Sequence, residues 1–196
     1  MNLSLDTDRD DWTRSLRLRI GTLPADPGPG DIENLLDRLT PVAWLAGCPD
    51  TRSLDLAHLP RRYRRHLVAG GSDDGYTALL IAWPPGYQSP VHDHAGLWGI
   101  ELVLEGALAI EEFSRDGVAG EPALAHERTL ILGIGDAASF TRPDYVHACR
   151  NLSSQQPALS LHVYGGVLDE YSAFHTSSRG RYTTTRQRAG IDAVMI

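Results

Sequence analysis

Two histidines stand two residues apart near the middle of the chain, in the sequence Val91-His92-Asp93-His94. Side chains of a β-strand point alternately to opposite faces, so a strand here would direct both imidazoles to one side. Neutral imidazoles that converge in this way are common ligands of divalent transition metals. Taken alone, such a pair also fits a core or a surface strand, so the neighbouring sequence has to distinguish these possibilities.

Further residues stand at fixed distances from this pair. A glycine lies six residues before the first histidine, another lies twelve residues after the second, and a third histidine is followed by an asparagine four residues later. This spacing resembles the two motifs of the cupin superfamily, in which a later strand supplies the third metal ligand. The resemblance implies an all-β, RmlC-like jelly-roll barrel with one metal ion held inside it by three histidines. The residues in register are Gly86, His92, His94, Gly106, His147 and Asn151.

Gly99 occupies the position where the cupin pattern usually has a glutamate ligand, five residues after His94. Glu101 shares the face of Gly99 by strand alternation and is an alternative source of a carboxylate. Because the motif register points to position 99, we favour a centre with three histidine ligands. Such a neutral and open ligand set favours a substrate that arrives as an anion and chelates the ion.

A second pattern lies between residues 158 and 164, where polar side chains alternate with apolar ones. Ser160, His162 and Tyr164 would therefore share one face of a strand. One interpretation is a strand with a solvated side. The other is a buried relay of hydroxyl, imidazole and phenol, which would orient Tyr164 for acid–base work beside a metal.

Tyr63 and Arg65 also share a face if residues 63–68 form a strand. A guanidinium presents a planar fork that matches a carboxylate, so Arg65 is a candidate clamp for an acidic substrate. Alternatively, Arg65 belongs to a solvated basic surface together with Arg61, Arg62 and Arg64.

Together these segments resemble the cysteine dioxygenase type I family of thiol dioxygenases, in particular its bacterial members. The resemblance implies that the three histidines bind Fe²⁺, that the arginine and the first tyrosine bind the substrate carboxylate, and that the Ser-x-His-x-Tyr segment is the catalytic relay. It covers about residues 60–165 and rests on Tyr63, Arg65, His92, His94, His147, Asn151, Ser160, His162 and Tyr164.

Two positions depart from the animal members of the family. There, a cysteine at the position of Gly99 is cross-linked to the tyrosine that corresponds to Tyr164, and glycine cannot form this thioether. Gly165 and Gly166 follow Tyr164 where the animal pattern has prolines. Bacterial relatives commonly lack the cross-link, so the resemblance still implies activity.

The implied reaction is the oxidation of L-cysteine by O₂ to cysteine sulfinic acid at Fe²⁺. Alternative substrates are 3-mercaptopropionate and mercaptosuccinate. Related mercaptopropionate enzymes tend to have glutamine where this chain has Arg65, which favours cysteine. An alternative of another class is a non-redox cupin that binds a small carboxylate or uses zinc, because three histidines and a water also describe catalytic zinc.

The elements that must position these residues are helices followed by strands. An apolar stripe at i, i+3, i+4 and i+7 over residues 32–39 predicts an amphipathic helix capped by Asp31, after an earlier helix near residues 11–20. We expect residues 1–60 to form a helical extension packed on a barrel of residues 61–196, in a single domain. Short β-prone runs between Gly, Pro, Asp and Ser clusters predict the strands. They are 63–68, 76–83, 91–94, 98–104, 107–113, 129–132, 137–140, 147–151 and 158–164.

The whole chain has 196 residues and a formal net charge of −7, which argues against a nucleic acid as its main partner. No stretch approaches the ~20 apolar residues of a membrane helix. The first residues are polar and acidic rather than a secretory signal, and Cys48 and Cys149 are expected to be free thiols. We therefore expect a cytoplasmic monomer or weak homo-oligomer whose partners are a small thiol and O₂.

Other residues of a reactive type are given ordinary roles. Cys149 shares the face of His147, but we favour a small buried hydrophobic side chain. The arginine-rich tail from Thr176 is expected to be a solvated strand and loop rather than a lid. Four histidines lack a partner at ligand spacing and are expected at the surface or in local hydrogen bonds: His58, His66, His126 and His175.

Overall fold

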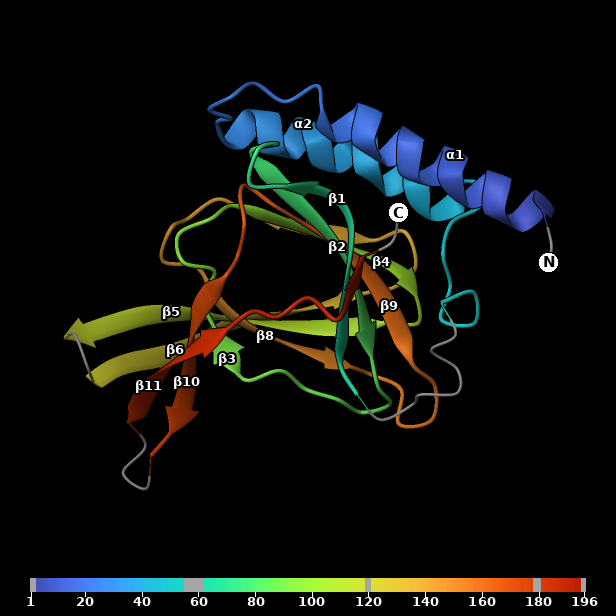
Figure 1. Ribbon diagram of the computed structural model, residues 1–196. Coiled ribbons are helices and arrows are strands. Elements are labelled where there is room, and N and C mark those ends of the chain that lie inside the picture. Colours follow the sequence, from blue (N-terminus) through green and yellow to red (C-terminus); the bar gives the residue numbers. More distant parts are fainter. Residues whose placement is uncertain (1–2, 55–61, 119–120, 178–180, 195–196) are drawn as a thin grey trace.

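The computed structural model describes residues 3–54, 62–118, 121–177 and 181–194 (Figure 1). Two helices, α1 (Leu3–Ile20) and α2 (Pro29–Leu39), and the 3₁₀ helix η1 (Thr40–Trp44) precede the strands. The strands are β1 (Arg64–Gly71), β2 (Tyr76–Trp83), β3 (Val91–His92), β4 (Gly99–Glu105), β5 (Leu108–Val118), β6 (Glu121–Leu132), β7 (Ala137–Phe140), β8 (Val146–Asn151), β9 (Ala158–Tyr164), β10 (Glu170–Thr176), β11 (Tyr182–Arg188) and β12 (Ala193–Val194).

The strands form two six-stranded sheets. The order in one is β12-β1-β2-β9-β4-β7, and in the other it is β11-β10-β3-β8-β5-β6. The sheets share a hydrophobic core, and α1 and α2 lie side by side over the outer face of the first sheet (Figure 1). This arrangement confirms the predicted all-β jelly-roll barrel with N-terminal helices packed on it.

Strand β9 has one face in the core under the helices and the other inside the barrel. This position accounts for the alternation of apolar and polar residues in its sequence. Leu161 and Val163 pack under the helices, together with apolar residues of β2 and β4. The opposite face, with Ser160, His162 and Tyr164, therefore points into the barrel, and all three side chains are almost fully buried. The interpretation of this face as a solvated one is wrong, because helices cover the outside of the sheet.

The first helix is longer than predicted, and the second starts earlier. Gly28, not Asp31, is the N-cap residue of α2, and Pro29 takes the first helical position. Asp31 lies in the first turn, where its carboxylate accepts a hydrogen bond from the backbone N–H of Gly28 at 3.0 Å. The apolar stripe is as predicted, because Ile32, Leu35 and Leu39 are fully buried.

Near the C-terminus, β10 and β12 were not predicted, and β11 was expected only as a solvated strand without bounds. β10 and β11 form an antiparallel hairpin, and β12 adds in parallel to β1. β11 is exposed along almost its whole length and carries polar residues on both faces, so its sequence lacks the alternation of a half-buried strand. Strand β6 also begins eight residues before the predicted start at Thr129, since its first part forms an exposed hairpin with β5.

Three residues of the cupin-like spacing have structural roles. Gly86 has φ 66° and Gly106 has φ 78°, a left-handed conformation that residues with a Cβ rarely adopt. The buried amide of Asn151 donates to the carbonyl oxygens of Trp83 and Pro84 at 3.2 and 3.1 Å. These contacts fix the loop that leads from β2 to the first histidine.

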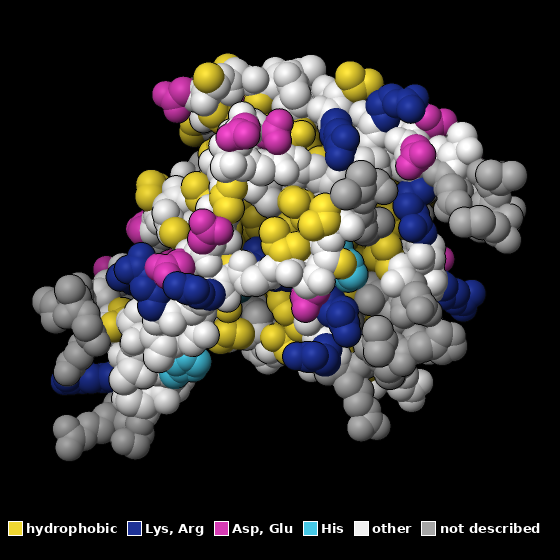
Figure 2. Space-filling model, in the orientation of Figure 1, with side chains coloured by type: hydrophobic (Ala, Val, Ile, Leu, Met, Phe, Trp, Pro, Cys, Tyr) yellow, Lys and Arg dark blue, Asp and Glu magenta, His cyan; other side chains and the backbone are white. Residues whose placement is uncertain are grey.

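Within the described residues, no helix combines the length and apolar character that crossing a membrane requires. On the face of the molecule in Figure 2, acidic and basic side chains of the described residues are intermixed, and hydrophobic ones gather near the middle.

Candidate metal centre

The three predicted ligands come from two paired strands and a loop. His92 on β3 pairs in register with His147 on β8, and His94 lies in the loop that follows β3. The ring centroids are separated by 5.0 Å between His92 and His94 and by 4.7 Å from each of these to His147. One nitrogen of each ring lies within 4.8 Å of the others. The fold thus brings the three imidazoles together in the barrel.

The nitrogen atoms of these rings fit a divalent cation. His92 Nδ1 lies 2.9 Å from the carbonyl oxygen of Pro90, which assigns the proton to Nδ1 and leaves a lone pair on Nε2. Both nitrogens of His94 are buried without a hydrogen-bond partner among the described residues. Because unpartnered buried polar atoms are unfavourable, a bound metal would satisfy these groups. Burial lowers the pKa of all three imidazoles, which keeps them in the neutral, ligating form.

A buried carboxylate stands next to the histidines, although the motif register favoured a centre without one. Glu101 on β4 is 3% exposed, and its Oε1 lies 3.6 Å from His147 Nε2 and 3.3 Å from His162 Nδ1. Burial alone would raise the pKa of this carboxyl, but His147 and His162 outweigh it and lower the pKa to about 2. Glu101 stands outside the group of three converging histidines, so the set of three histidine ligands stays a prediction, with a carboxylate beside it.

Packing around Gly99 leaves no room for a side chain at that position. Gly99 pairs with Phe140 of β7, and a Cβ at position 99 would overlap the Phe140 ring. The same ring lies 4.4 Å, centroid to centroid, from the His94 imidazole. Phe140 thus fills the space that a longer side chain at position 99 would need.

The three polar side chains of β9 form a chain of hydrogen bonds. The Trp83 indole N–H donates to Ser160 Oγ at 2.8 Å, and Ser160 Oγ lies 2.8 Å from His162 Nε2. Since the serine oxygen accepts from Trp83, its own proton points to Nε2, so Nδ1 carries the imidazole proton. His162 Nδ1 lies 3.1 Å from the hydroxyl of Tyr164. The phenol therefore accepts from His162 and keeps its own proton for another partner.

Tyr164 lies beside the histidines. Its ring centroid is 5.6 Å from that of His94, and the two rings are stacked. Burial, helped by the nearby Glu101 carboxylate, raises the pKa of Tyr164 well above that of a free tyrosine. The phenol is therefore protonated near neutral pH and can act as a hydrogen-bond donor.

A cavity of about 300 Å³ leads to this group of residues. Tyr63, Arg65, His92 and Tyr164 all line it, together with a C-terminal segment, residues 188–192. Arg65 is buried, and its Nη1 donates to the carbonyl oxygen of Gly190 at 3.4 Å. In the part of the chain that the structure describes, its other guanidinium N–H groups remain available to an anion in the cavity. Because Arg65 is buried, the interpretation of this residue as part of a solvated basic surface is wrong.

The C-terminal segment contributes more to the cavity than expected. Figure 1 shows the chain after β11 crossing the barrel to reach β1. The backbone N–H of Arg65 donates to Asp192 Oδ2 at 2.9 Å, and Asp192 N donates to Arg65 O at 2.8 Å. The prediction of a solvated strand and loop is correct for β11 but wrong for residues 188–192, which form one wall of the cavity.

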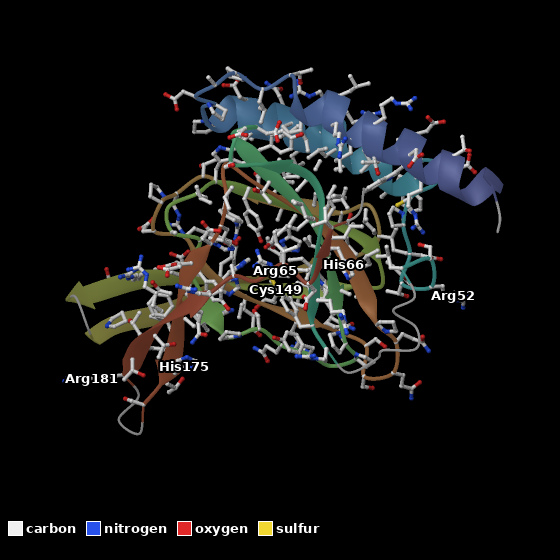
Figure 3. The ribbon with its side chains drawn as sticks, in the orientation of Figure 1. Arg52, Arg65, His66, Cys149, His175 and Arg181 are labelled. Atoms are coloured by element: carbon white, nitrogen blue, oxygen red, sulfur yellow. The ribbon has the colours of Figure 1, made fainter. Side chains whose placement is uncertain are left out.

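The residues that were given ordinary roles divide into buried and exposed groups. Cys149 is buried, as expected, and burial raises the pKa of its thiol well above the ordinary value. Figure 3 shows Arg65 and Cys149 inside the barrel, whereas His175 and Arg181 lie on the β10–β11 hairpin. His66 is buried on β1, His126 is exposed and contacts Thr129, and His58 is outside the described residues.

A jelly-roll barrel whose interior holds three converging histidines defines a metal-binding cupin. The sequence profile of the cysteine dioxygenase type I family matches residues 54–177. The chain belongs to this family, which confirms the resemblance noted from the sequence.

Curated relatives agree with this assignment. Cysteine dioxygenase type 1 of Homo sapiens is 29% identical over 127 residues, and that of Rattus norvegicus is 30% identical over the same length. Each alignment covers 63% of this chain and 62% of the relative. The chain thus spans less than two thirds of the length of these relatives.

Similar solved structures include a protein from Thermus thermophilus, with 27% identity and a TM-score of 0.41, covering 54% of this chain and 84% of that one. A cupin superfamily protein from Desulfitobacterium hafniense has 18% identity and a TM-score of 0.40, covering 59% of this chain and 91% of that one.

Proposed function

We propose that this protein is an iron-dependent thiol dioxygenase that oxidises L-cysteine to cysteine sulfinic acid. One observation carries the proposal: Arg65, His92 and Tyr164 line a single cavity. Membership of the cysteine dioxygenase type I family supports the reaction class. In this reaction one thiol and one O₂ give one sulfinic acid, so both oxygen atoms go to sulfur and no external reductant is consumed.

His92, His94 and His147 would hold the iron, since their neutral nitrogens converge and those of His94 lack another partner among the described residues. When bound, Fe²⁺ would lower the pKa of the thiol and supply the electron transfer through which dioxygen reacts, which no protein side chain provides. Phe140 and Tyr145 flank the histidines with stacked rings 4.3 Å apart and limit the access of water from that side.

Arg65 would orient the substrate by its carboxylate. The guanidinium is permanently charged and buried, so a carboxylate in the cavity would form charge-assisted hydrogen bonds with it away from bulk water. Tyr63 lines the same cavity and packs between Trp83 and Tyr87, with ring centroids 5.1 Å from each. This packing would hold the tyrosine beside the substrate carboxylate.

Tyr164 would hold a proton at its phenolic oxygen next to the reacting sulfur. Ser160 and His162 set the direction of that proton through the hydrogen bonds on β9. A donor fixed in this way can stabilise negative charge that develops on the oxidant or the product.

A second candidate substrate is mercaptosuccinate, which has two carboxylates. Arg188 lines the cavity together with Arg65, so a second guanidinium is available to a second carboxylate. The Arg188 side chain is 91% exposed and lies 4.0 Å from Glu170, so it holds this position less firmly than Arg65 does. L-cysteine therefore remains the first choice.

For the test, the protein is first loaded with Fe²⁺ under anaerobic conditions. Thiol-dependent oxygen uptake is then measured after O₂ is admitted. L-cysteine, 3-mercaptopropionate and mercaptosuccinate are compared at matched iron occupancy. We expect the highest kcat/KM with L-cysteine and a sulfinic acid as product. A higher value with mercaptosuccinate would identify the second candidate, and an iron-replete protein without thiol-dependent oxygen uptake would overturn the proposal.

A further inference from the structure

The backbone of Arg65 is held on one side by a single residue near the C-terminus. Arg65 lies opposite Ile81 of β2 in the strand register, yet its N–H donates to Asp192 Oδ2 at 2.9 Å and its C=O accepts from the Asp192 N–H at 2.8 Å. In an antiparallel pair, every second residue directs both backbone groups away from its partner strand. Asp192 therefore satisfies both backbone groups of Arg65 on the side that faces away from β2.

The carboxylate of Asp192 takes the place of a strand carbonyl. The parallel pairing of β12 with β1 covers only the two residues that follow Arg65. One position earlier, the side chain of Asp192 accepts the hydrogen bond that a neighbouring strand would otherwise accept. A hydrogen bond to an ionised carboxylate is stronger than one to a neutral carbonyl. Asp192 thus anchors the C-terminal segment, residues 188–192, at the point where it meets β1.

The same segment holds the guanidinium of Arg65. Gly190, two residues before Asp192, accepts a hydrogen bond from Arg65 Nη1 at 3.4 Å. On the other side, the Ala189 N–H donates to the carbonyl oxygen of Asp169 at 2.7 Å. Because the contact of the guanidinium is long, it constrains the side chain less than the shorter backbone bonds do. The direction of the guanidinium therefore depends on where these bonds hold Arg65 and Gly190.

The contacts with Asp192 bear on how the cavity binds an anion. Arg65 is buried, and Arg65, Gly190 and Asp192 all line the cavity. A guanidinium binds a carboxylate best when its planar fork meets the two oxygens in line. We propose that Asp192 is a positioning residue for the substrate carboxylate, because it holds the backbone of Arg65 and the segment that orients the guanidinium.

This inference rests on the proposed function, in which Arg65 binds the carboxylate of the substrate, and adds a residue 127 positions away to that interaction. A purely electrostatic effect of Asp192 would have the opposite sign. Its negative charge at the cavity repels an anionic substrate, so removing the charge alone would strengthen binding. A variant that keeps the hydrogen bond and loses the charge separates the two effects.

The test compares Asp192→Ala with Asp192→Asn. Anaerobic binding of L-cysteine and of cysteamine, which has no carboxylate, is followed by the visible absorption of protein loaded with Co²⁺, a probe for the divalent ion. We expect Asp192→Ala to weaken L-cysteine binding by about 10-fold and to leave cysteamine binding within about twofold. Asp192→Asn should bind L-cysteine at least as tightly as the unchanged protein, because its amide oxygen still accepts from the Arg65 N–H.

The matched control is Asp73→Ala, an exposed residue in the turn between β1 and β2 that does not line the cavity. The double variant Arg65→Ala/Asp192→Ala should bind L-cysteine as Arg65→Ala does, since Asp192 acts through Arg65. In steady-state oxygen uptake, Asp192→Ala should raise KM for L-cysteine and change kcat less than about twofold.

Three results would overturn the proposal. They are normal L-cysteine binding by Asp192→Ala, an equal loss of cysteamine binding, and a loss in Asp192→Asn as large as that in Asp192→Ala. If Asp192→Ala does not fold, Asp192→Glu replaces it, because glutamate keeps the charge and moves the acceptor by one methylene. This variant should also bind L-cysteine less tightly, and normal binding would contradict the proposal.

The binding measurements need no dioxygen, so they separate this inference from the proposed activity. Protein that binds L-cysteine through Asp192 and Arg65 but does not oxidise it would overturn the proposed function alone.

Discussion

Arg65 is the residue that should separate thiol acids from thiols without a carboxylate. It is buried in the cavity wall and has guanidinium donors that no described residue occupies. Replacing Arg65 with alanine should raise KM for L-cysteine about 10- to 100-fold, because charge-assisted hydrogen bonds to the carboxylate are lost. The KM for cysteamine, which has no carboxylate, should change little.

The matched control is Arg64→Ala. Arg64 is adjacent on β1, but its side chain does not line the cavity. Steady-state oxygen uptake measures both variants. A normal KM for L-cysteine in Arg65→Ala would show that this arginine does not hold the substrate.

A substitution of Tyr164 tests the hydrogen-bond relay on β9. Tyr164→Phe keeps the ring that stacks on His94 and removes only the hydroxyl that contacts His162. We expect kcat for thiol oxidation to fall about 10²- to 10⁴-fold, as for the loss of a proton donor, with metal content unchanged. If kcat stays normal while the metal is retained, the phenol has no part in the reaction.

The sequence could predict the histidines, Arg65 and Tyr164 because their positions depend on local spacing and strand alternation. It left Glu101 as an alternative and did not place it beside His147. That placement depends on Phe140, which comes from a different strand and fills the space at Gly99. Packing between strands distant in the chain leaves no mark in the spacing of either one.

Strand β9 connects the helices to the site through its two faces. Leu159, Leu161 and Val163 pack beneath α1 and α2, and the relay residues face the barrel. The alternation of apolar and polar residues predicted this strand with its observed bounds, Ala158–Tyr164. The bounds of β11 could not be predicted, because exposed polar strands carry no such periodicity, and β10 was missed altogether.

Helix α2 should stabilise the barrel without contributing to its chemistry. Leu35 is fully buried between this helix and the first sheet. Leu35→Ala should lower the free energy of unfolding by about 2–5 kcal/mol, because it leaves a cavity in a packed core.

Urea denaturation measures this change, with the exposed Glu33→Ala on the same helix as control. The affinity of folded Leu35→Ala for Co²⁺ should equal that of the unchanged protein. A stability equal to that of the control would mean that the helix does not pack on the sheet as described.

The stability of the whole molecule should depend on pH through His66, which is buried on β1 away from the metal centre. Burial, with a smaller contribution from Arg64, lowers the pKa of His66 despite the nearby Asp192. In the unfolded chain the imidazole is protonated at about pH 6.5, whereas in the folded protein it is protonated only at lower pH. The neutral, buried His66 therefore contributes to the free energy of unfolding above about pH 6.5, and this contribution is lost as the pH falls below that value.

Replacing His66 with glutamine should make the metal-free protein less sensitive to acid. Between about pH 7.5 and 5.5, its free energy of unfolding should fall by less than that of the unchanged protein. Exposed His126→Gln serves as the control and should follow the unchanged protein. Equal pH dependence in His66→Gln and the unchanged protein would contradict the assignment.

The barrel, the histidines and the wall formed by residues 188–192 together enclose one cavity. The C-terminal segment completes this cavity through the pairing of β12 with β1 and the hydrogen bonds between Asp192 and Arg65, contacts between distant parts of the chain that the sequence did not reveal. The proposed function therefore depends on the folded molecule as a unit. The product of the proposed reaction distinguishes a thiol dioxygenase from a non-redox cupin.

The most direct measurement is the fate of ¹⁸O₂ in a reaction of Fe²⁺-loaded protein with L-cysteine, followed by mass spectrometry. We predict cysteine sulfinic acid in which both new oxygen atoms carry the label, with one O₂ consumed for each thiol. Disulfide as the main product, or label in only one of the two sulfinic oxygens, would contradict the proposed function.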